Sequence, residues 1–218
     1  MKFAVTMALA GVGCVASVAL AGPVTVSFGR VTSNADENVA SQFSAVVSEV
    51  AGQPNRVDFR FSNTAVIESS ISEVYFDSRN TSPLSSLLGL TQQGARFVGG
   101  GANPGNLPGG NGLTTPFQAV GSFSADAQGN PSRGLDVATD FLTMTFRLSD
   151  GGTFDSLVAA LRNGDLRLGL HVRAIGDDGK SDSFVSTPPP PPITVIPLPS
   201  AAASAFVGLL ALGGIRRR

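Results

Sequence analysis

The chain holds one histidine, so a histidine-based catalytic site has a single candidate base. His171 lies between Arg167 and Arg173 in a segment where polar residues alternate with leucine and valine. A Ser-His-Asp triad needs a histidine that accepts a proton, and neighbouring positive charge opposes protonation of an imidazole. This pattern favours a solvated surface histidine. Zinc catalysis is disfavoured too, because the sequence after Ala21 contains no cysteine and no second histidine to hold the metal.

Three carboxylates gather at Asp177, Asp178 and Asp182, around Gly179. Calcium prefers several oxygen ligands on a flexible loop, but no glutamate follows at EF-hand spacing and Lys180 stands among the candidate ligands. A solvated hairpin turn is therefore the favoured interpretation, with calcium binding as the alternative. No pair of acids is singled out for glycoside hydrolysis, and the chain has one tyrosine and no tryptophan to line a sugar site. We assign no catalytic, cofactor-binding or metal-binding residue from the sequence.

A stretch rich in glycine and proline runs from Thr91 to Gln118. The glycines at 99–101 suggest a phosphate-binding loop, but no Gly-Lys-Ser/Thr sequence ends it and no helical pattern follows. Long loops inside compact domains are often functional or mobile. We expect a surface excursion that could meet a ligand.

Short strands must position these residues, because apolar and polar residues alternate through much of the chain. One helix is expected over Thr153–Arg162, where four apolar residues follow helical spacing before Asn163 and Gly164. About eight or nine strands with one helix predict an all-β fold, an antiparallel β-sandwich or jelly roll over residues 22–187. The predicted strands include Val24–Val31, Phe43–Val50, Arg56–Phe61, Ile71–Phe76, Phe141–Leu148, Leu166–Ala174 (expected as the longest) and Ser183–Ser186.

Composition fits one such domain, since 42% of the 218 residues are apolar and only 14% are charged. Without Lys2 and the three arginines at the chain end, 11 of the 15 basic residues remain against 16 acidic residues, a net charge of −5. Phosphate binding needs a basic patch, so nucleic acid is disfavoured as a partner.

The first 21 residues are predicted to be a secretory signal peptide. Lys2 precedes an apolar stretch, and Ala19 and Ala21 fit the small-x-small pattern that signal peptidase cleaves. The chain's one cysteine, Cys14, would be removed with this segment, leaving no disulfide. A lipoprotein signal that modifies Cys14 is the alternative.

The last residues are predicted to form a short transmembrane helix. Ala201–Ile215 carries no charge, and a helix from Pro199 to Ile215 spans roughly 25 Å at 1.5 Å per residue, slightly under the ~30 Å hydrocarbon layer. Arg216, Arg217 and Arg218 would stay cytoplasmic and leave the body on the other side. The alternative is a buried C-terminal helix. Residues 188–196 begin with five prolines and are expected to form a polyproline spacer.

The order of Pro197, Leu198, Pro199 and Ser200, an apolar helix and terminal arginines resembles the PEP-CTERM sorting domain, in a Pro-Leu-Pro variant, over residues 197–218. The body also resembles a recurring domain of PEP-CTERM surface proteins through Phe59–Asn63, Ile71–Asp77, Gly101–Gly110 and Leu166–Val172. The resemblance implies a bacterial surface protein whose tail is recognised, and removed or exchanged, by an exosortase-type membrane enzyme.

Together these features predict a non-enzymatic protein of the cell surface, outer envelope or extracellular matrix. It would be held transiently or stably in the membrane by its C-terminal helix and have a structural or adhesive role. Exopolysaccharide is a candidate partner. The alternative is a carbohydrate- or calcium-dependent binding module that uses Thr91–Gln118 or Asp177–Asp182; an enzyme is the third possibility.

Overall fold

The computed structural model describes residues 22–78, 82–128 and 130–191. The expected signal segment with Ala19 and Ala21, and the expected sorting segment of residues 197–218, lie outside these ranges. Within them, no helix has the length and apolar character needed to cross a bilayer.

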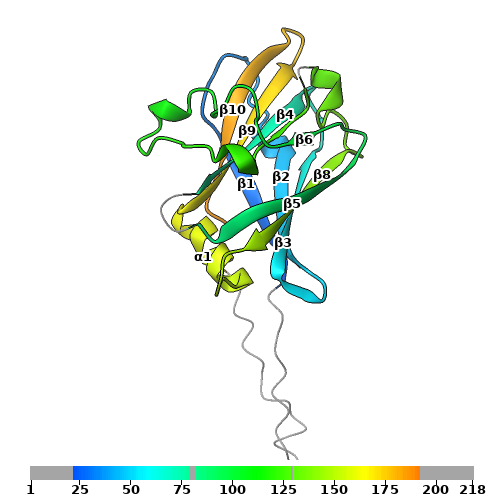
Figure 1. The fold of residues 1–218 in the computed structure, drawn as a ribbon. Helices are drawn as coiled ribbons and strands as arrows, with labels where there is room; N and C mark the ends of the chain where they lie inside the picture. The colour runs from blue at the N-terminus through cyan, green and yellow to red at the C-terminus, as the bar shows by residue number, and fades with distance from the viewer. Residues whose placement is uncertain (1–21, 79–81, 129, 192–218) are drawn as a thin grey trace, which may run out of the picture.

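The described residues form a ten-stranded antiparallel sheet and one α-helix (Figure 1). The strand order is β5-β8-β3-β2-β1-β10-β9-β4-β7-β6. The strands are β1 (Val24–Arg30), β2 (Phe43–Val50), β3 (Gln53–Asn63), β4 (Ser70–Ser78), β5 (Leu84–Gln93), β6 (Val98–Gly99), β7 (Ala125–Asp126), β8 (Phe141–Leu148), β9 (Leu166–Ile175) and β10 (Lys180–Ser186). The helix is α1 (Phe154–Asn163), and 3₁₀ turns span Ala40–Gln42, Gly110–Gly112, Gly121–Phe123 and Pro131–Arg133. The prediction of an all-β antiparallel fold with one helix is confirmed.

Strand β1 joins the two halves of the sheet. Its first part, from Val24 to Ser27, pairs with β2, and its last part, from Phe28 to Arg30, pairs with β10. The sheet then curls until its end strands meet. Their contact is shown at Gly99 of β6, where a Cβ would lie 3.0 Å from the Leu87 side chain of β5. The sheet is therefore nearly closed around its core.

Alternating residues of the strands fill this core. Val57, Phe59 and Phe61 of β3 are fully buried, as their period of two predicts. The ring of Phe76 lies 5.0 Å from that of Phe59 and 4.7 Å from that of Phe146, in tilted or edge-to-face contact. Aromatic pairs in these geometries add about 0.5–1.5 kcal/mol each to the burial of their area.

The bounds of two predicted strands are confirmed, but the strand expected to be the longest is not, and one strand is missing from the prediction. Strands β2 and β8 have the expected bounds, but β3, with 11 residues, is longer than β9, with 10. Strand β5 was not predicted at all. Its pairing with β8 shifts register twice, so its leucines do not keep the period of two that reveals a strand.

Helix α1 begins and ends as its sequence predicts. Thr153 and Ser156 form a capping box, with Thr153 Oγ1 accepting from the Ser156 N–H and Ser156 Oγ accepting from the Thr153 N–H. Gly164 ends the helix at a φ of 76°, a left-handed conformation that glycine adopts readily. Its buried residues are the four expected from helical spacing: Phe154, Leu157, Val158 and Leu161.

The segment after β6 runs over the outer face of β4 and β9 as a surface excursion, but a few of its residues are buried against the sheet. Residues 91–93 belong to β5, and the part of the chain from 100 to 120, here called the excursion, buries Ala102, Leu107 and Phe117 against Tyr75 of β4. These four residues form a second apolar cluster, separate from the main core. Strand β4 is consequently buried on both faces.

Both ends of the described body leave from the same end of the molecule, beside α1 and the β2–β3 hairpin (Figure 1). The N–H of Thr187 donates to the carbonyl of Ser27, which holds the end of the chain against its beginning. Pro189, within the expected spacer, is buried.

Candidate functional site

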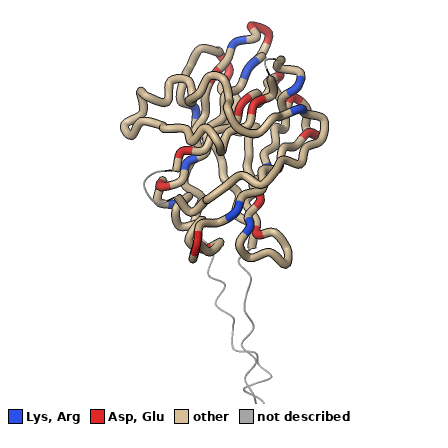
Figure 2. Tube along the Cα trace, in the orientation of Figure 1, with Lys and Arg blue, Asp and Glu red and all other residues tan. Residues whose placement is uncertain are grey.

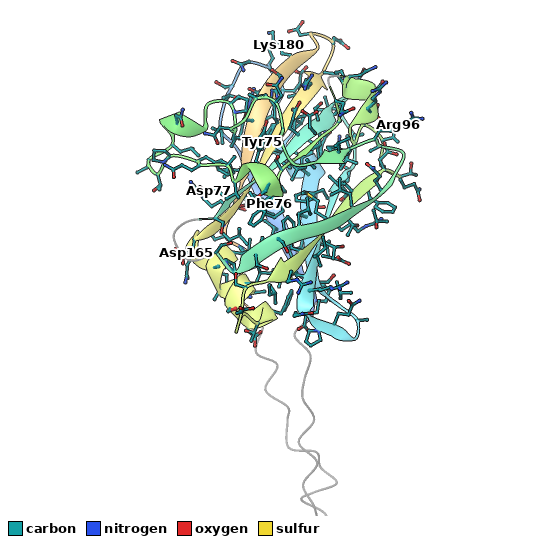
Figure 3. The ribbon with its side chains drawn as sticks, in the orientation of Figure 1. Tyr75, Phe76, Asp77, Arg96, Asp165 and Lys180 are labelled. Atoms are coloured by element: carbon teal, nitrogen blue, oxygen red, sulfur yellow. The ribbon has the colours of Figure 1, made fainter. Side chains whose placement is uncertain are left out.

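The outer face of β4 and β9 carries two facing rows of residues. Strand β4 directs Glu73, Tyr75 and Asp77 outward, because Val74 and Phe76 point into the core. Their partners across β9 are His171, Gly169 and Arg167, in that order. Figure 3 shows Tyr75 and Asp77 along β4 beside the excursion. Acidic residues of one strand thus meet basic residues of the other.

Glu73 is the buried centre of this face. Its side chain is 0% exposed; Oε2 lies 2.7 Å from His171 Nδ1, and Oε1 accepts a hydrogen bond from the Arg173 guanidinium. A buried carboxylate is costly unless it is paired and hydrogen-bonded, and both partners are present here. The prediction of a solvated His171 is wrong: its side chain is 13% exposed and held by a carboxylate from another strand.

Tyr75 fixes the excursion over the sheet. Its hydroxyl donates to the Pro104 carbonyl at 2.9 Å. Burial raises the pKa of this hydroxyl far above its ordinary value, and the charges of Glu73 and Asp126 raise it further, against the opposing effect of Arg173. Tyr75 therefore remains a proton donor at neutral pH.

Arg167 holds the other end of the excursion. Its Nε donates to Asp77 Oδ2 at 3.0 Å, and its two terminal nitrogens donate to the carbonyls of Thr115 and Pro116 at 2.8 and 2.7 Å. The guanidinium carbon also lies 5.3 Å from the centre of the Phe117 ring. The acid–base pairs of β4 and β9 thus sit at both ends of the apolar cluster.

A cleft of about 660 Å³ opens beside Glu73. Asp126 stands on its rim, where Oδ2 accepts from the Asn103 N–H at 3.0 Å and Oδ1 accepts from the Gln128 N–H. Within the described ranges, no hydrogen bond engages the side-chain amide of Asn103 or Gln128. The lining residues are Asn103, Pro104, Asp126, Gln128, His171 and Arg173.

The cleft is better suited to binding than to acyl transfer. Ser183 of β10 lies opposite His171, so Glu73, His171 and Ser183 follow the order of a catalytic triad. However, Ser183 is 0% exposed, and its hydroxyl has no hydrogen-bond partner in the part of the chain that is described. A hydroxyl that neither contacts the histidine nor reaches the cleft cannot act as its nucleophile.

The carboxylates around Gly179 do not converge. Asp178 pairs with Lys180 at 3.0 Å at the exposed tip of the β9–β10 hairpin, whereas Asp182 is buried and lies 2.5 Å from the Arg30 guanidinium. Asp182 also accepts from the Thr32 hydroxyl at 2.8 Å and from the Asn34 N–H at 2.8 Å. The solvated-turn interpretation therefore holds for Asp178 but is wrong for Asp182. The described residues contain no group of three or more histidine, cysteine or acidic side chains placed to hold a metal.

Charge is spread over the described surface without a continuous basic stretch (Figure 2). No charged residue lies between Arg96 and Asp126, so the excursion is neutral throughout. Charged groups that bond to its backbone come from the neighbouring strands, Asp126 of β7 at Asn103 and Arg167 of β9 at Thr115 and Pro116.

No protein family and no curated protein matched the chain. A structure solved in work on pH-induced modulation of Streptococcus parasanguinis adhesion by Fap1 fimbriae is similar over 81% of this chain and 98% of that chain, at 11% sequence identity and a TM-score of 0.40. A likeness this low does not transfer a fold or a role.

Proposed function

We propose that the chain is an exported, non-enzymatic β-sandwich-like protein of the bacterial cell surface or extracellular matrix, with an adhesive or structural role. The observation that carries the proposal is the position of the two body ends. The two ends of the described body leave from one end of the domain (Figure 1), so segments attached to both would leave the opposite end open to partners. An apolar segment with terminal arginines after this body is the pattern of a membrane-held tail.

The tail is proposed to be a PEP-CTERM-like signal, read by an exosortase-type enzyme after signal peptidase has cleaved behind Ala21. Deletion of Pro197 to Arg218 from a tagged full-length chain tests this. We expect the deleted protein to appear in the medium, and the intact protein to fractionate with the envelope or matrix. Unchanged delivery of the deleted protein would refute the sorting role.

A second variant separates recognition of the motif from simple anchoring. Replacing Pro197, Leu198, Pro199 and Ser200 with alanine keeps the apolar segment and Arg216, Arg217 and Arg218. An exosortase substrate would then stay unprocessed in the membrane, and its mass would remain that of the uncleaved tail. Processing identical to that of the unaltered chain would contradict recognition by an exosortase.

Carbohydrate binding is a second candidate function, and the cleft beside Glu73 favours it. Calcium binding at the β9–β10 turn has no comparable support, because Asp182 forms an ion pair with Arg30.

A further inference from the structure

We propose that the cleft beside Glu73 binds the ring of a neutral sugar, as one unit of a polysaccharide. The inference deepens the adhesive role proposed above and rests on it for the source of the ligand. Three properties of the cleft favour such a ligand: a rigid floor, a rim of paired donors and acceptors, and a charge balance that disfavours ions.

The floor is pre-organised by one buried carboxylate. Glu73 holds both His171 and Arg173, whose side chains are 13% and 25% exposed. Because Nδ1 of His171 is occupied by Glu73, Nε2 is the ring atom that remains for a ligand. Side chains held in this way lose little rotamer freedom when a ligand binds, which favours affinity.

The rim offers donors and acceptors side by side. Each Asp126 oxygen accepts one backbone N–H and keeps a further lone pair. The amides of Asn103 and Gln128 add both kinds of group on either side of it. A sugar hydroxyl is itself a donor and an acceptor, so neighbouring hydroxyls match such a rim.

Gln128 is held in an unusual conformation at this rim. Its φ is 55°, in the left-handed region that few residues other than glycine adopt. Residues in such regions cost roughly 1–3 kcal/mol and cluster where a ligand is held. Gln128 adopts this conformation where it lines the cleft.

Charge and size point to a neutral ring. Glu73 and Asp126 stand beside Arg173 and His171, so the cleft has no excess of positive charge to attract phosphate or carboxylate ligands. A metal ion would face Arg173, and no group of three metal ligands occurs among the described residues. The volume of about 660 Å³ lies within the usual range for small-ligand sites. Pro104, whose backbone carbonyl accepts from the Tyr75 hydroxyl at 2.9 Å, supplies an apolar ring for the face of a sugar.

Saturation-transfer NMR on the purified full-length chain tests the proposal. The probes are the methyl glycosides of glucose, galactose and mannose, with methyl glucuronoside as the anionic arm and calcium chloride alone as the cation arm. We expect transfer to at least one neutral glycoside. Gln128→Ala and Asp126→Asn should each weaken that binding about tenfold or more, which corresponds to the loss of roughly 1.4 kcal/mol.

Gln118→Ala is the matched control, because Gln118 is an exposed amide of the excursion that does not line the cleft. It should leave transfer unchanged, and thermal unfolding should show that Gln128→Ala is folded. Transfer to no neutral glycoside, stronger transfer to the glucuronoside, chemical-shift changes of cleft residues with calcium alone, or equal loss in Gln118→Ala would overturn the proposal. The assay does not involve export, so its failure leaves the sorting experiment to decide the proposed function separately.

Discussion

At the residue scale, Asp182 links the stability of the fold to pH. Burial alone would raise the pKa of its carboxyl, but hydrogen bonds from the Asn34 N–H, the Thr32 hydroxyl and the Arg30 guanidinium outweigh burial and hold the pKa below its ordinary value. A carboxyl with a lowered folded pKa stabilises the protein at pH values above its unfolded pKa of about 4, and this contribution is lost as pH falls through the folded value.

We predict that Asp182→Asn lowers the free energy of unfolding by about 1–3 kcal/mol at neutral pH, because charge-assisted hydrogen bonds are lost. The variant should also lose less stability on acidification below about pH 4 than the unaltered chain. Urea unfolding at a series of pH values measures both effects.

Asp178→Asn is the control, since Asp178 is exposed and pairs with Lys180 on the surface, where ion pairs contribute about 0–1 kcal/mol. Identical pH slopes for Asp182→Asn and the unaltered chain would contradict this assignment.

The sequence shows the two rows of the site but not their pairing. Glu73, Tyr75 and Asp77 alternate with core residues, and so do Arg167, His171 and Arg173, which is a detectable sign of two charged faces. What the sequence lacks is the register that sets Glu73 opposite His171. In the sequence, the arginine neighbours of His171 are therefore the only guide to its surroundings. Asn103, Asp126 and Gln128 carry no local signal, because only the excursion and the pairing of β7 with β4 bring them near β9.

At the element scale, the excursion depends on a glycine in the strand beneath it. A Cβ on Gly169 of β9 would lie 2.9 Å from the Phe117 ring and 3.2 Å from a methyl group of Leu107. Leu107 and Phe117 stand among glycines and prolines, so no periodicity marks them as buried. Their burial depends on the tertiary contact with β4 and β9, so the sequence predicts the surface loop but not the two side chains that anchor it.

Gly169→Ala is predicted to displace the excursion without unfolding the main core. Overpacking at such a contact costs about 1–3 kcal/mol, and limited proteolysis between residues 101 and 118 should be faster. Gly89→Ala on β5 is the matched control, because a Cβ there has no atom within 4 Å. If both variants are cleaved at the same rate as the unaltered chain, the glycine does not determine how the excursion packs.

At the scale of the whole molecule, side-chain contacts bring the two end strands of the sheet together, since no strand pairing in the described residues joins β5 to β6. Gln92 at the end of β5 bridges to the buried Phe97: its Nε2 donates to the Phe97 carbonyl at 3.1 Å, and its Oε1 accepts from the Phe97 N–H at 2.5 Å. This bridge turns the chain back toward β6, which lies against β5. With Cys14 the chain's one cysteine, closure of the body relies on such non-covalent contacts.

Gln92→Ala is predicted to loosen the contact between β5 and β6. Two hydrogen bonds are lost and polar groups of Phe97 are left without these partners, which costs about 1–3 kcal/mol. If the opening is local, amide hydrogen exchange should accelerate in β5 and β6 by about tenfold for each 1.4 kcal/mol, while β2 and β3, deep in the sheet order, keep their protection. Gln93→Ala is the neighbouring control, since its amide makes one long, exposed hydrogen bond to Thr139 at 3.4 Å. Equal exchange in the two variants would show that the Gln92 bridge does not hold β5 and β6 together.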